Sequence, residues 1–383
     1  PWTTWLRGYN VTHVLFVRRH VTIGIRSPKP IRYFCTVMTE PTELWSTDLD
    51  LPADSVEFCP ARPDVFVVGM YKLNEEVGER EGALTAFRRL GSGDVQQVCS
   101  LGCLPGVLDI KWEKDLLAAA LSDGSVKLFH LKDQQVETVA SCQAASCLAL
   151  SVAWAPGGKD LAASCSDGSV SLLSHGPASL EPVAQIQCHG FEAWCVVWDT
   201  SQPHVFYTGG DDCRLCRWDQ RSPTQATRTL RRHTMGVTSI APHPCEEYML
   251  ASGSYDEGVL LWDSRSLLAP LAEGQAGGGA WRLRWRSCKG RNLLAVAAMH
   301  GGACVLAHNS TDVLERLCTF SGHQSMAYGI DWAESDTLAS CSFYDKHLAL
   351  WRHSALRENE QPAVFEFPAS SPRFHFPLIL CPV

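Results

Sequence analysis

Short acidic turns recur along this chain at a nearly constant interval, and this regularity constrains the fold more than any other feature. Consecutive turn aspartates are 44, 45 and 44 residues apart, and the last step of 89 residues equals two such intervals. His300, in the segment AAMHGG, stands where the missing aspartate is expected. The turn aspartates are Asp123, Asp167, Asp212, Asp256 and Asp345. A repeat of this length with strands, turns and Trp-Asp dipeptides is typical of a β-propeller.

Seven short segments of alternating apolar residues give the expected number of blades. Each segment opens a repeat, and most end in tryptophan, as the inner strand of a blade would. The segments are residues 54–58, 108–112, 150–154, 195–198, 237–244, 282–285 and 329–332. The sequence therefore predicts an all-β protein, a seven-bladed WD40 β-propeller.

The propeller is expected to occupy residues 38–352. The last blade lacks a fourth strand of its own, and we expect residues 43–49 (ELWSTDL) to supply it and so to cover the open edge. Residues 1–37 fit no repeat, so a non-native or disordered extension is expected there, and residues 353–383 are expected to form an irregular tail. The polar stretch 71–90 is expected to be a loop inserted in the first blade.

Charge and composition limit the possible function. The 383 residues carry a net charge of −8 with no clustered basic face, which argues against a protein that binds nucleic acid directly. The 17 cysteines lie mostly in strand-like segments and predict buried thiols in a reducing, cytoplasmic compartment. No apolar run is long enough to span a membrane, and no secretory signal is evident. We expect a monomer that does not bind membranes.

Two sets of polar residues resemble catalytic triads but recur with the repeat. Their internal spacings of 19, 4 and 6 residues are the same in both sets, and His323, Asp345 and Trp351 repeat part of the pattern. A reaction centre is needed once, whereas a hydrogen-bond network that stabilises a blade is needed in each blade. We therefore expect structural tetrads. They are His189, Thr208, Asp212 and Trp218 in one repeat, and His233, Ser252, Asp256 and Trp262 in the next.

Other motifs give little support for cofactor chemistry. Cys213 and Cys216 form a single CxxC motif, but residues three apart on a strand face opposite sides, so no metal site is expected. The glycine run 277–279 lacks the Lys-Ser/Thr of a phosphate-binding loop. The nucleophile elbow GxSxG is absent. We expect no cofactor.

Candidate binding residues stand where the repeats differ. Four residues before the inner-strand tryptophan, three repeats carry Trp194, Trp281 and Tyr328, whereas two others carry leucine. Tyr255 and Tyr344 precede two of the turn aspartates. Large rings at the start of the inner strands could line the central opening and hold a ligand, although packing between blades is an equally good explanation.

Candidate catalytic residues come from the same comparison. His300 replaces a turn aspartate, which makes it available as a general base because its ordinary pKa is near physiological pH. Glu192 lies just before Trp194, and Asp211 precedes the turn aspartate of the same repeat. Together with the aromatic residues, these acidic groups would suit a cationic or amphipathic ligand.

Several stretches of the chain resemble one WD-repeat family. They are HGFEAW, YTGGDDCRLCRWD, RRHTMGVTSI, ASGSYDEGVLLWD, GGGAWRLRW, AAMHGG and ASCSFYDKHLALW, and the resemblance covers residues 43–352. The family is the diphthine methyl ester hydrolases of diphthamide biosynthesis, also named diphthine methyltransferases.

The resemblance implies an enzyme that acts on translation elongation factor 2. It would hydrolyse the methyl ester of methylated diphthine and give diphthine and methanol. No catalytic residues are carried over from the family, so the assignments of His300, Glu192 and Asp211 rest on the residues alone. Two alternatives are a non-catalytic WD40 scaffold and an adaptor that presents a substrate to a ubiquitin ligase. A transferase is not favoured, because no glycine-rich strand-helix cofactor motif is present.

Overall fold

A computed structural model describes the fold of residues 15–18, 32–37, 40–91, 93–132, 135–286, 292–309, 311–333, 336–356 and 364–366. These residues form two separate units, and the larger, Pro41–Leu356, holds all the candidate functional residues. The described part of the chain contains no helix with the length and apolar character needed to cross a membrane.

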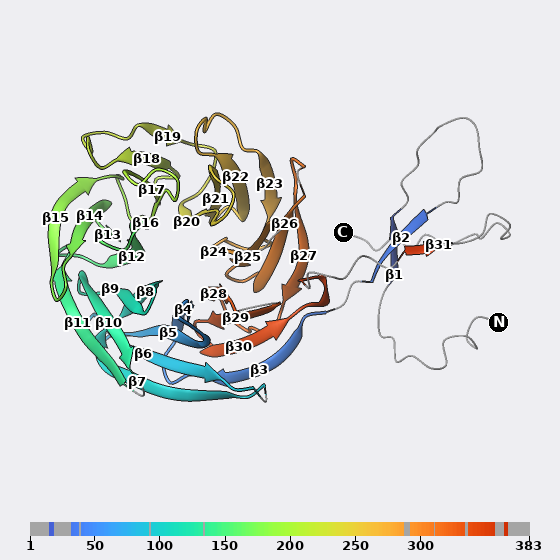
Figure 1. Ribbon diagram of the computed structural model, residues 1–383, viewed down its shortest axis with the longest axis horizontal. Coiled ribbons are helices and arrows are strands. Elements are labelled where there is room, and N and C mark those ends of the chain that lie inside the picture. The colour runs from blue at the N-terminus through green and yellow to red at the C-terminus, as the bar shows by residue number, and fades with distance from the viewer. Residues whose placement is uncertain are drawn as a thin grey trace. The chain divides into compact units, whose positions relative to one another are not determined.

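The larger unit is built from seven four-stranded antiparallel sheets arranged in a ring, as a seven-bladed propeller (Figure 1). Blade 1 comprises β4 (Ala53–Cys59), β5 (Arg62–Asn74), β6 (Glu79–Arg89) and β7 (Val95–Pro105). Blade 2 comprises β8 (Val107–Glu113), β9 (Leu116–Leu121), β10 (Ser125–Lys132) and β11 (Gln135–Gln143). Blade 3 comprises β12 (Ala149–Trp154), β13 (Asp160–Cys165), β14 (Ser169–His175) and β15 (Leu180–Gln187).

The remaining blades repeat this order. Blade 4 comprises β16 (Ala193–Trp198), β17 (Val205–Gly210), β18 (Leu215–Asp219) and β19 (Arg228–Leu230). Blade 5 comprises β20 (Val237–Pro242), β21 (Met249–Ser254), β22 (Gly258–Asp263) and β23 (Ala272–Gln275). Blade 6 comprises β24 (Arg282–Arg286), β25 (Asn292–Ala297), β26 (Ala303–His308) and β27 (Leu314–Phe320).

Blade 7 is assembled from both ends of the unit. It comprises β28 (Ala327–Trp332), β29 (Thr337–Ser342), β30 (His347–Arg352) and, as its outermost strand, β3 (Thr42–Asp48). Trp45 of β3 pairs in register with Leu350 and packs its ring 6.0 Å from that of Phe87 in blade 1. The first strand of the unit therefore joins the last blade to the first.

Apolar side chains hold neighbouring blades together. The second strands are almost fully apolar and buried, as in LLAAAL of β9 and LAASC within β13, because both of their faces are covered by adjacent blades. Phe66 of blade 1 and Leu348 of blade 7, for example, belong to one buried cluster. Burying side chains of this size stabilises the fold by about 1.5–3 kcal/mol each.

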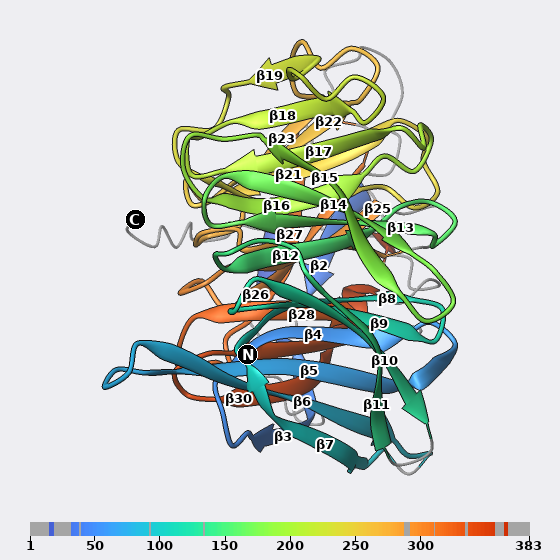
Figure 2. The ribbon, with the colours of Figure 1, turned by 90° about the vertical axis from the view of Figure 1, so that its left-hand side faces the viewer.

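The stretch that follows Tyr71 in blade 1 is a β-hairpin, so the prediction of an inserted loop was wrong. Strands β5 and β6 continue in register from Tyr71, opposite Gly82, to Asn74, opposite Glu79. Gly78, with a φ of 72°, closes the turn in a conformation that favours glycine. The polar residues misled the prediction because an exposed hairpin has no apolar face. Figure 2 shows this hairpin extending beyond the neighbouring blades.

The smaller unit contains three short described strands. They are β1 (Leu15–Arg18), β2 (Arg32–Val37) and β31 (Val364–Glu366), which pair in the order β1-β2-β31. Most of residues 1–37 and 357–383 lie outside the described residues, so the expected extension and tail remain predictions. At the beginning of the tail, the 3-10 turn Ser354–Leu356 buries Leu356 in the core between blades 6 and 7.

Candidate functional site

The candidate residues gather on one face of the propeller. Because successive strands are antiparallel, the turn between the second and third strands of a blade lies on the face where its inner strand begins. We call this face the entry face. It carries the turn aspartates and the residues that open each inner strand.

In blade 4 the predicted tetrad residues form one hydrogen-bonded chain. His189 lies with Nδ1 2.8 Å from Asp212 Oδ1 and Nε2 2.7 Å from Thr208 Oγ1. Trp218 Nε1 donates to the same Thr208 oxygen at 3.0 Å. His189 and Thr208 are buried, so this chain connects the entry-face turn with the interior of the blade.

Blade 5 repeats this arrangement. His233 Nε2 lies 2.8 Å from Ser252 Oγ, which also accepts a hydrogen bond from Trp262 Nε1 at 2.9 Å. His233 Nδ1 is 3.2 Å from both carboxylate oxygens of Asp256. Burial lowers the pKa of His233, and the charge of Asp256 opposes this shift only in part. A buried neutral imidazole in a repeated network is suited to holding the turn in place.

Blade 7 departs from this arrangement because its turn is one residue longer. His323 Nε2 contacts Ser340 Oγ at 2.7 Å, but Nδ1 contacts Ser342 Oγ at 2.8 Å instead of the turn aspartate. The extra residue also shifts the aromatic position. Phe343, whose amide donates to Met326 O, takes the place that Tyr255 has in blade 5, and Tyr344 is 70% exposed.

Aromatic rings from five blades form a continuous row on the entry face, which we call the aromatic wall. It consists of Trp194, Tyr255, Trp281, Tyr328, Phe343 and Tyr71. Successive ring centroids from Trp194 through Trp281 to Tyr328 are 5.6 and 5.0 Å apart. The row continues through Phe343 to the ring of Tyr71 in steps of 5.6 and 4.9 Å. All six side chains are half-buried.

The structure thus brings together four of the five predicted binding residues and adds two. The fifth, Tyr344, contacts Phe343 of the aromatic wall, with the ring centroids 5.1 Å apart. Phe343 was missed because the turn aspartate was used to align the repeats, and the longer turn displaces that alignment by one residue. The sequence did contain a signal for Phe343: Asp345 follows Ser340 by one residue more than Asp256 follows Ser252.

The three predicted catalytic residues do not form one cluster. His300 is exposed, and its Nε2 lies 3.9 Å from Glu257 Oε1 in the adjacent turn of blade 5. Asp211 Oδ1 accepts a hydrogen bond from Trp194 Nε1 at 3.1 Å, and its amide donates to the carbonyl of Glu192. Within the described residues, His300 makes no hydrogen bond or ion pair with Glu192 or Asp211.

The turn of His300 nevertheless adjoins the aromatic wall. Its neighbour Met299 exchanges backbone hydrogen bonds with Ala327, the residue before Tyr328. Ala298 and Gly302, on either side of the turn, are joined by a further backbone hydrogen bond. The turn that carries His300 is therefore held against the start of β28, beside the residue that precedes Tyr328.

One acidic residue of the entry face was not recognised from the sequence. Asp54 occupies the same strand position in blade 1 as Trp194 and Trp281 in their blades, because Phe58 replaces the tryptophan that usually ends the inner strand. Its side chain is almost completely buried. Burial raises the pKa of Asp54 to about 7, with Arg282 opposing the shift.

Deeper along the inner strands lies a buried network of opposite charges from four blades. Asp109 accepts hydrogen bonds from Lys111 Nζ at 2.6 Å, Arg282 Nη1 at 2.5 Å and Ser151 Oγ at 2.9 Å. Burial alone would raise the pKa of Asp109, but the charges of Lys111 and Arg282 outweigh it and lower the pKa. A second group joins Arg284 to Glu57 and to Asp331.

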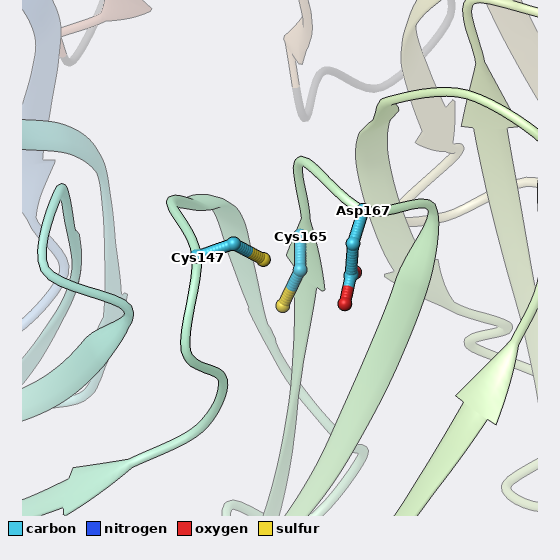
Figure 3. A group of neighbouring side chains, drawn as sticks. All are labelled: Cys147, Cys165 and Asp167. Carbon is cyan, nitrogen blue, oxygen red and sulfur yellow. The ribbon is translucent and has the colours of Figure 1, made fainter.

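One further cluster resembles a metal site. The ligand atoms of Cys147, Cys165 and Asp167 lie within 4.8 Å of one another, the only such group in the described part of the chain. Figure 3 shows Cys147 pointing from its loop toward Cys165. Asp167 Oδ1 already accepts hydrogen bonds from Ser169 N and Oγ, as Asp123 does from Ser125 in blade 2, which explains its position without a metal. Burial raises the pKa of Cys165 to about 12. The expected absence of a metal remains a prediction.

Comparison with known proteins places these features in a family. Residues 224–263 and 314–352 match the family model "WD domain, G-beta repeat", and residues 110–201 match "Anaphase-promoting complex subunit 4 WD40 domain". A chain of the solved structure "Crystal Structure of Mitotic Checkpoint Complex" shares the fold, with a TM-score of 0.67 and 16% identity. The match covers 88% of this chain and 99% of the solved chain.

Curated relatives match over most of their length. A "Diphthine methyltransferase" of Schizosaccharomyces pombe is 34% identical over 80% of this chain and 96% of its own. The proteins of the same name from Homo sapiens and Mus musculus are 33% and 32% identical. These matches cover 76% and 84% of this chain and 74% and 77% of the human and mouse proteins. With a seven-bladed propeller and similarity of this degree over most of each chain, the chain belongs to the diphthine methyltransferase family of WD-repeat proteins.

Proposed function

We propose that this protein acts in diphthamide biosynthesis by hydrolysing the methyl ester of methylated diphthine on translation elongation factor 2, which releases methanol. The observation that carries the proposal is the aromatic wall on the entry face. The modified histidine of that substrate carries a trimethylammonium group, and the faces of aromatic rings attract such a cation. The protein substrate would bring its modified side chain to this face.

The chemistry needs a base that activates water for attack on the ester carbonyl. In this proposal His300 takes the proton from the water, and methoxide leaves as methanol after protonation. Glu257, 3.9 Å away, would stabilise the imidazolium that forms. Glu192 and Asp211, at the far end of the aromatic wall, would instead contribute negative charge to the entry face.

A direct assay tests both parts of the proposal. Methyl-esterified elongation factor 2 is incubated with the purified protein, and loss of the ester is followed by mass spectrometry together with methanol release. We expect His300→Ala to lower kcat by about 10²–10⁴-fold, the usual contribution of a general base. His204→Ala, at an exposed histidine of the turn before β17, should retain the activity of the wild type.

The result also separates an enzyme from a scaffold. Tight binding of the factor without methanol release would support the non-catalytic WD40 scaffold or adaptor. Full activity of His300→Ala would instead support the proposed hydrolysis and exclude His300 as its general base.

A further inference from the structure

Asp54 is a buried carboxyl group without a hydrogen-bond partner among the described residues. Its side chain is 4% exposed. The nearest cation is Arg282, whose Nη2 lies 3.6 Å from Asp54 Oδ2, while Nη1 of the same guanidinium is held by Asp109 at 2.5 Å. At 3.6 Å this contact is an ion pair without a short hydrogen bond, so the carboxyl oxygens of Asp54 can still accept a further cationic partner.

The surroundings of Asp54 are aromatic. It opens β4 at the position that Trp281 and Tyr328 occupy in blades 6 and 7. Burial raises the pKa of Tyr71, and the charge of Asp54 is the next largest cause. Burial followed by Asp54 likewise raises the pKa of Tyr328 to about 12.

Contacts of the backbone and of Arg282 also connect these residues. The amide of Tyr71 donates to Pro52 O at 2.9 Å. Arg282 donates from Nε to Tyr328 O at 3.3 Å, while its Nη2 lies 3.6 Å from Asp54. The carboxyl group therefore lies at this end of the aromatic wall.

We propose that Asp54 and the adjoining rings Tyr71, Tyr328 and Trp281 form a binding site for a quaternary ammonium group, with Asp54 as its counter-ion. A quaternary ammonium donates no conventional hydrogen bond, so it needs ring faces and a nearby negative charge instead of acceptors. A metal ion would need several oxygen, nitrogen or sulfur ligands, whereas this site offers one carboxylate and two phenols whose raised pKa keeps them neutral. The site deepens the proposed function, because the trimethylammonium of methylated diphthine is such a group.

Binding of a cation should depend on pH. The charged groups that face Asp54 are Arg282 of β24 and Asp109 and Lys111 of β8, and the other titratable groups that interact with it are Tyr71, Tyr255, Tyr328 and Cys341. With a pKa near 7, the carboxyl is protonated in much of the free protein at neutral pH. A cation favours its ionised form, so affinity should rise between about pH 6 and pH 8, with release of a proton.

The test uses choline and its neutral isostere 3,3-dimethylbutan-1-ol, which replaces the quaternary nitrogen by carbon. Binding to the full chain is measured by titration calorimetry and by tryptophan fluorescence, to which Trp281 of the site contributes. We expect choline to bind about tenfold more tightly than the isostere, corresponding to the usual strength of a desolvated cation–aromatic contact. Equal affinity of the wild type for the two probes would overturn the proposal, whatever the variants do.

Asp54→Asn should abolish the preference for choline and its pH dependence. Asp64→Asn, at an exposed aspartate of β5 in the same blade, is the matched control and should keep both. Unchanged choline affinity in Asp54→Asn would exclude this residue as the counter-ion. If Asp54→Asn fails to fold, Tyr328→Leu provides a second variant, and it should weaken choline more than the isostere.

The assay does not depend on ester hydrolysis. Selective choline binding without methanol release from elongation factor 2 would retain the site and remove the proposed function. Methanol release without any preference for the cation would retain the proposed hydrolysis and remove the quaternary ammonium site.

Discussion

His323 shows how one inserted residue changes the hydrogen bonds of a turn that recurs in several blades. In blades 4 and 5 the corresponding histidine contacts an aspartate, whereas His323 contacts two serines, Ser340 and Ser342. Burial, and after it the charge of the neighbouring His347, lowers the pKa of His323 to about 4, although Asp345 opposes the shift. The folded protein therefore keeps this imidazole neutral under conditions that protonate it in the unfolded chain.

This difference predicts a loss of stability in mild acid. The folded-state pKa lies below the unfolded value, so the contribution is complete above about pH 6.5 and is lost as the pH falls toward 4. We expect His323 to account for about 1–3 kcal/mol of the acid-induced decrease in unfolding free energy. Urea unfolding at pH 7.5 and pH 5.0 measures it. His323→Gln should show a smaller decrease, whereas His204→Gln, at an exposed site, should match the wild type; an unchanged decrease in His323→Gln would contradict the account.

At the same scale, the sequence predicted only part of the candidate site. Trp194, Trp281 and Tyr328 were predictable because strand alternation places them all at the start of an inner strand. Asp54 and Phe343 were not, since each lies in a repeat that departs locally from the others. Whether these rings bind substrate stays a prediction.

Among the strands, β3 differs from the others because it comes from the start of the propeller and completes its last blade. Its pairing with β30 covers the edge that blade 7 would otherwise expose, and Trp45 adds contact with blade 1. The repeat spacing was enough to predict seven blades. It did not predict the long hairpin of blade 1, because an exposed hairpin and a loop have similarly polar sequences.

The closure predicts a measurable cost for removing the Trp45 ring. Trp45 is half-buried against Phe87, so Trp45→Ala should lower the unfolding free energy by about 2–3 kcal/mol, somewhat less than for a fully buried tryptophan. Leu44→Ala, at the exposed residue of the bulge beside it, should change it by less than about 0.5 kcal/mol. Denaturant unfolding checks both values, and equal effects of the two substitutions would show that the contact with blade 1 does not secure the ring.

On the scale of the whole molecule, the buried charges connect blades that are distant in the sequence. Asp109 of blade 2 is bonded to Arg282 of blade 6, 173 residues later, and to Ser151 of blade 3. The individual charges are visible in the inner-strand segments, but their pairing across the ring requires the closed fold. One sequence therefore does not reveal it.

Removing one charged side chain of this buried network should leave its partners as uncompensated buried charges. We expect Asp109→Ala to lower the unfolding free energy by about 3–5 kcal/mol. Asp115→Ala, at an exposed aspartate of the following turn, should have an effect below about 0.5 kcal/mol. Thermal and denaturant unfolding of both variants measure the difference. Adding Arg282→Met to Asp109→Ala should cost less than the sum of the single changes, and simple additivity would argue against direct coupling.

The pairing of β3 with β30 also has a consequence for the order of events during synthesis. Asp48 and its partner His347 are 299 residues apart. At roughly 5–20 residues per second, β3 leaves the ribosome about 15–60 seconds before its partner exists. During that interval the nascent chain carries an unpaired strand edge and an unburied Trp45. A chaperone that binds exposed tryptophan side chains would meet this segment early, and release from it would coincide with completion of the final blade.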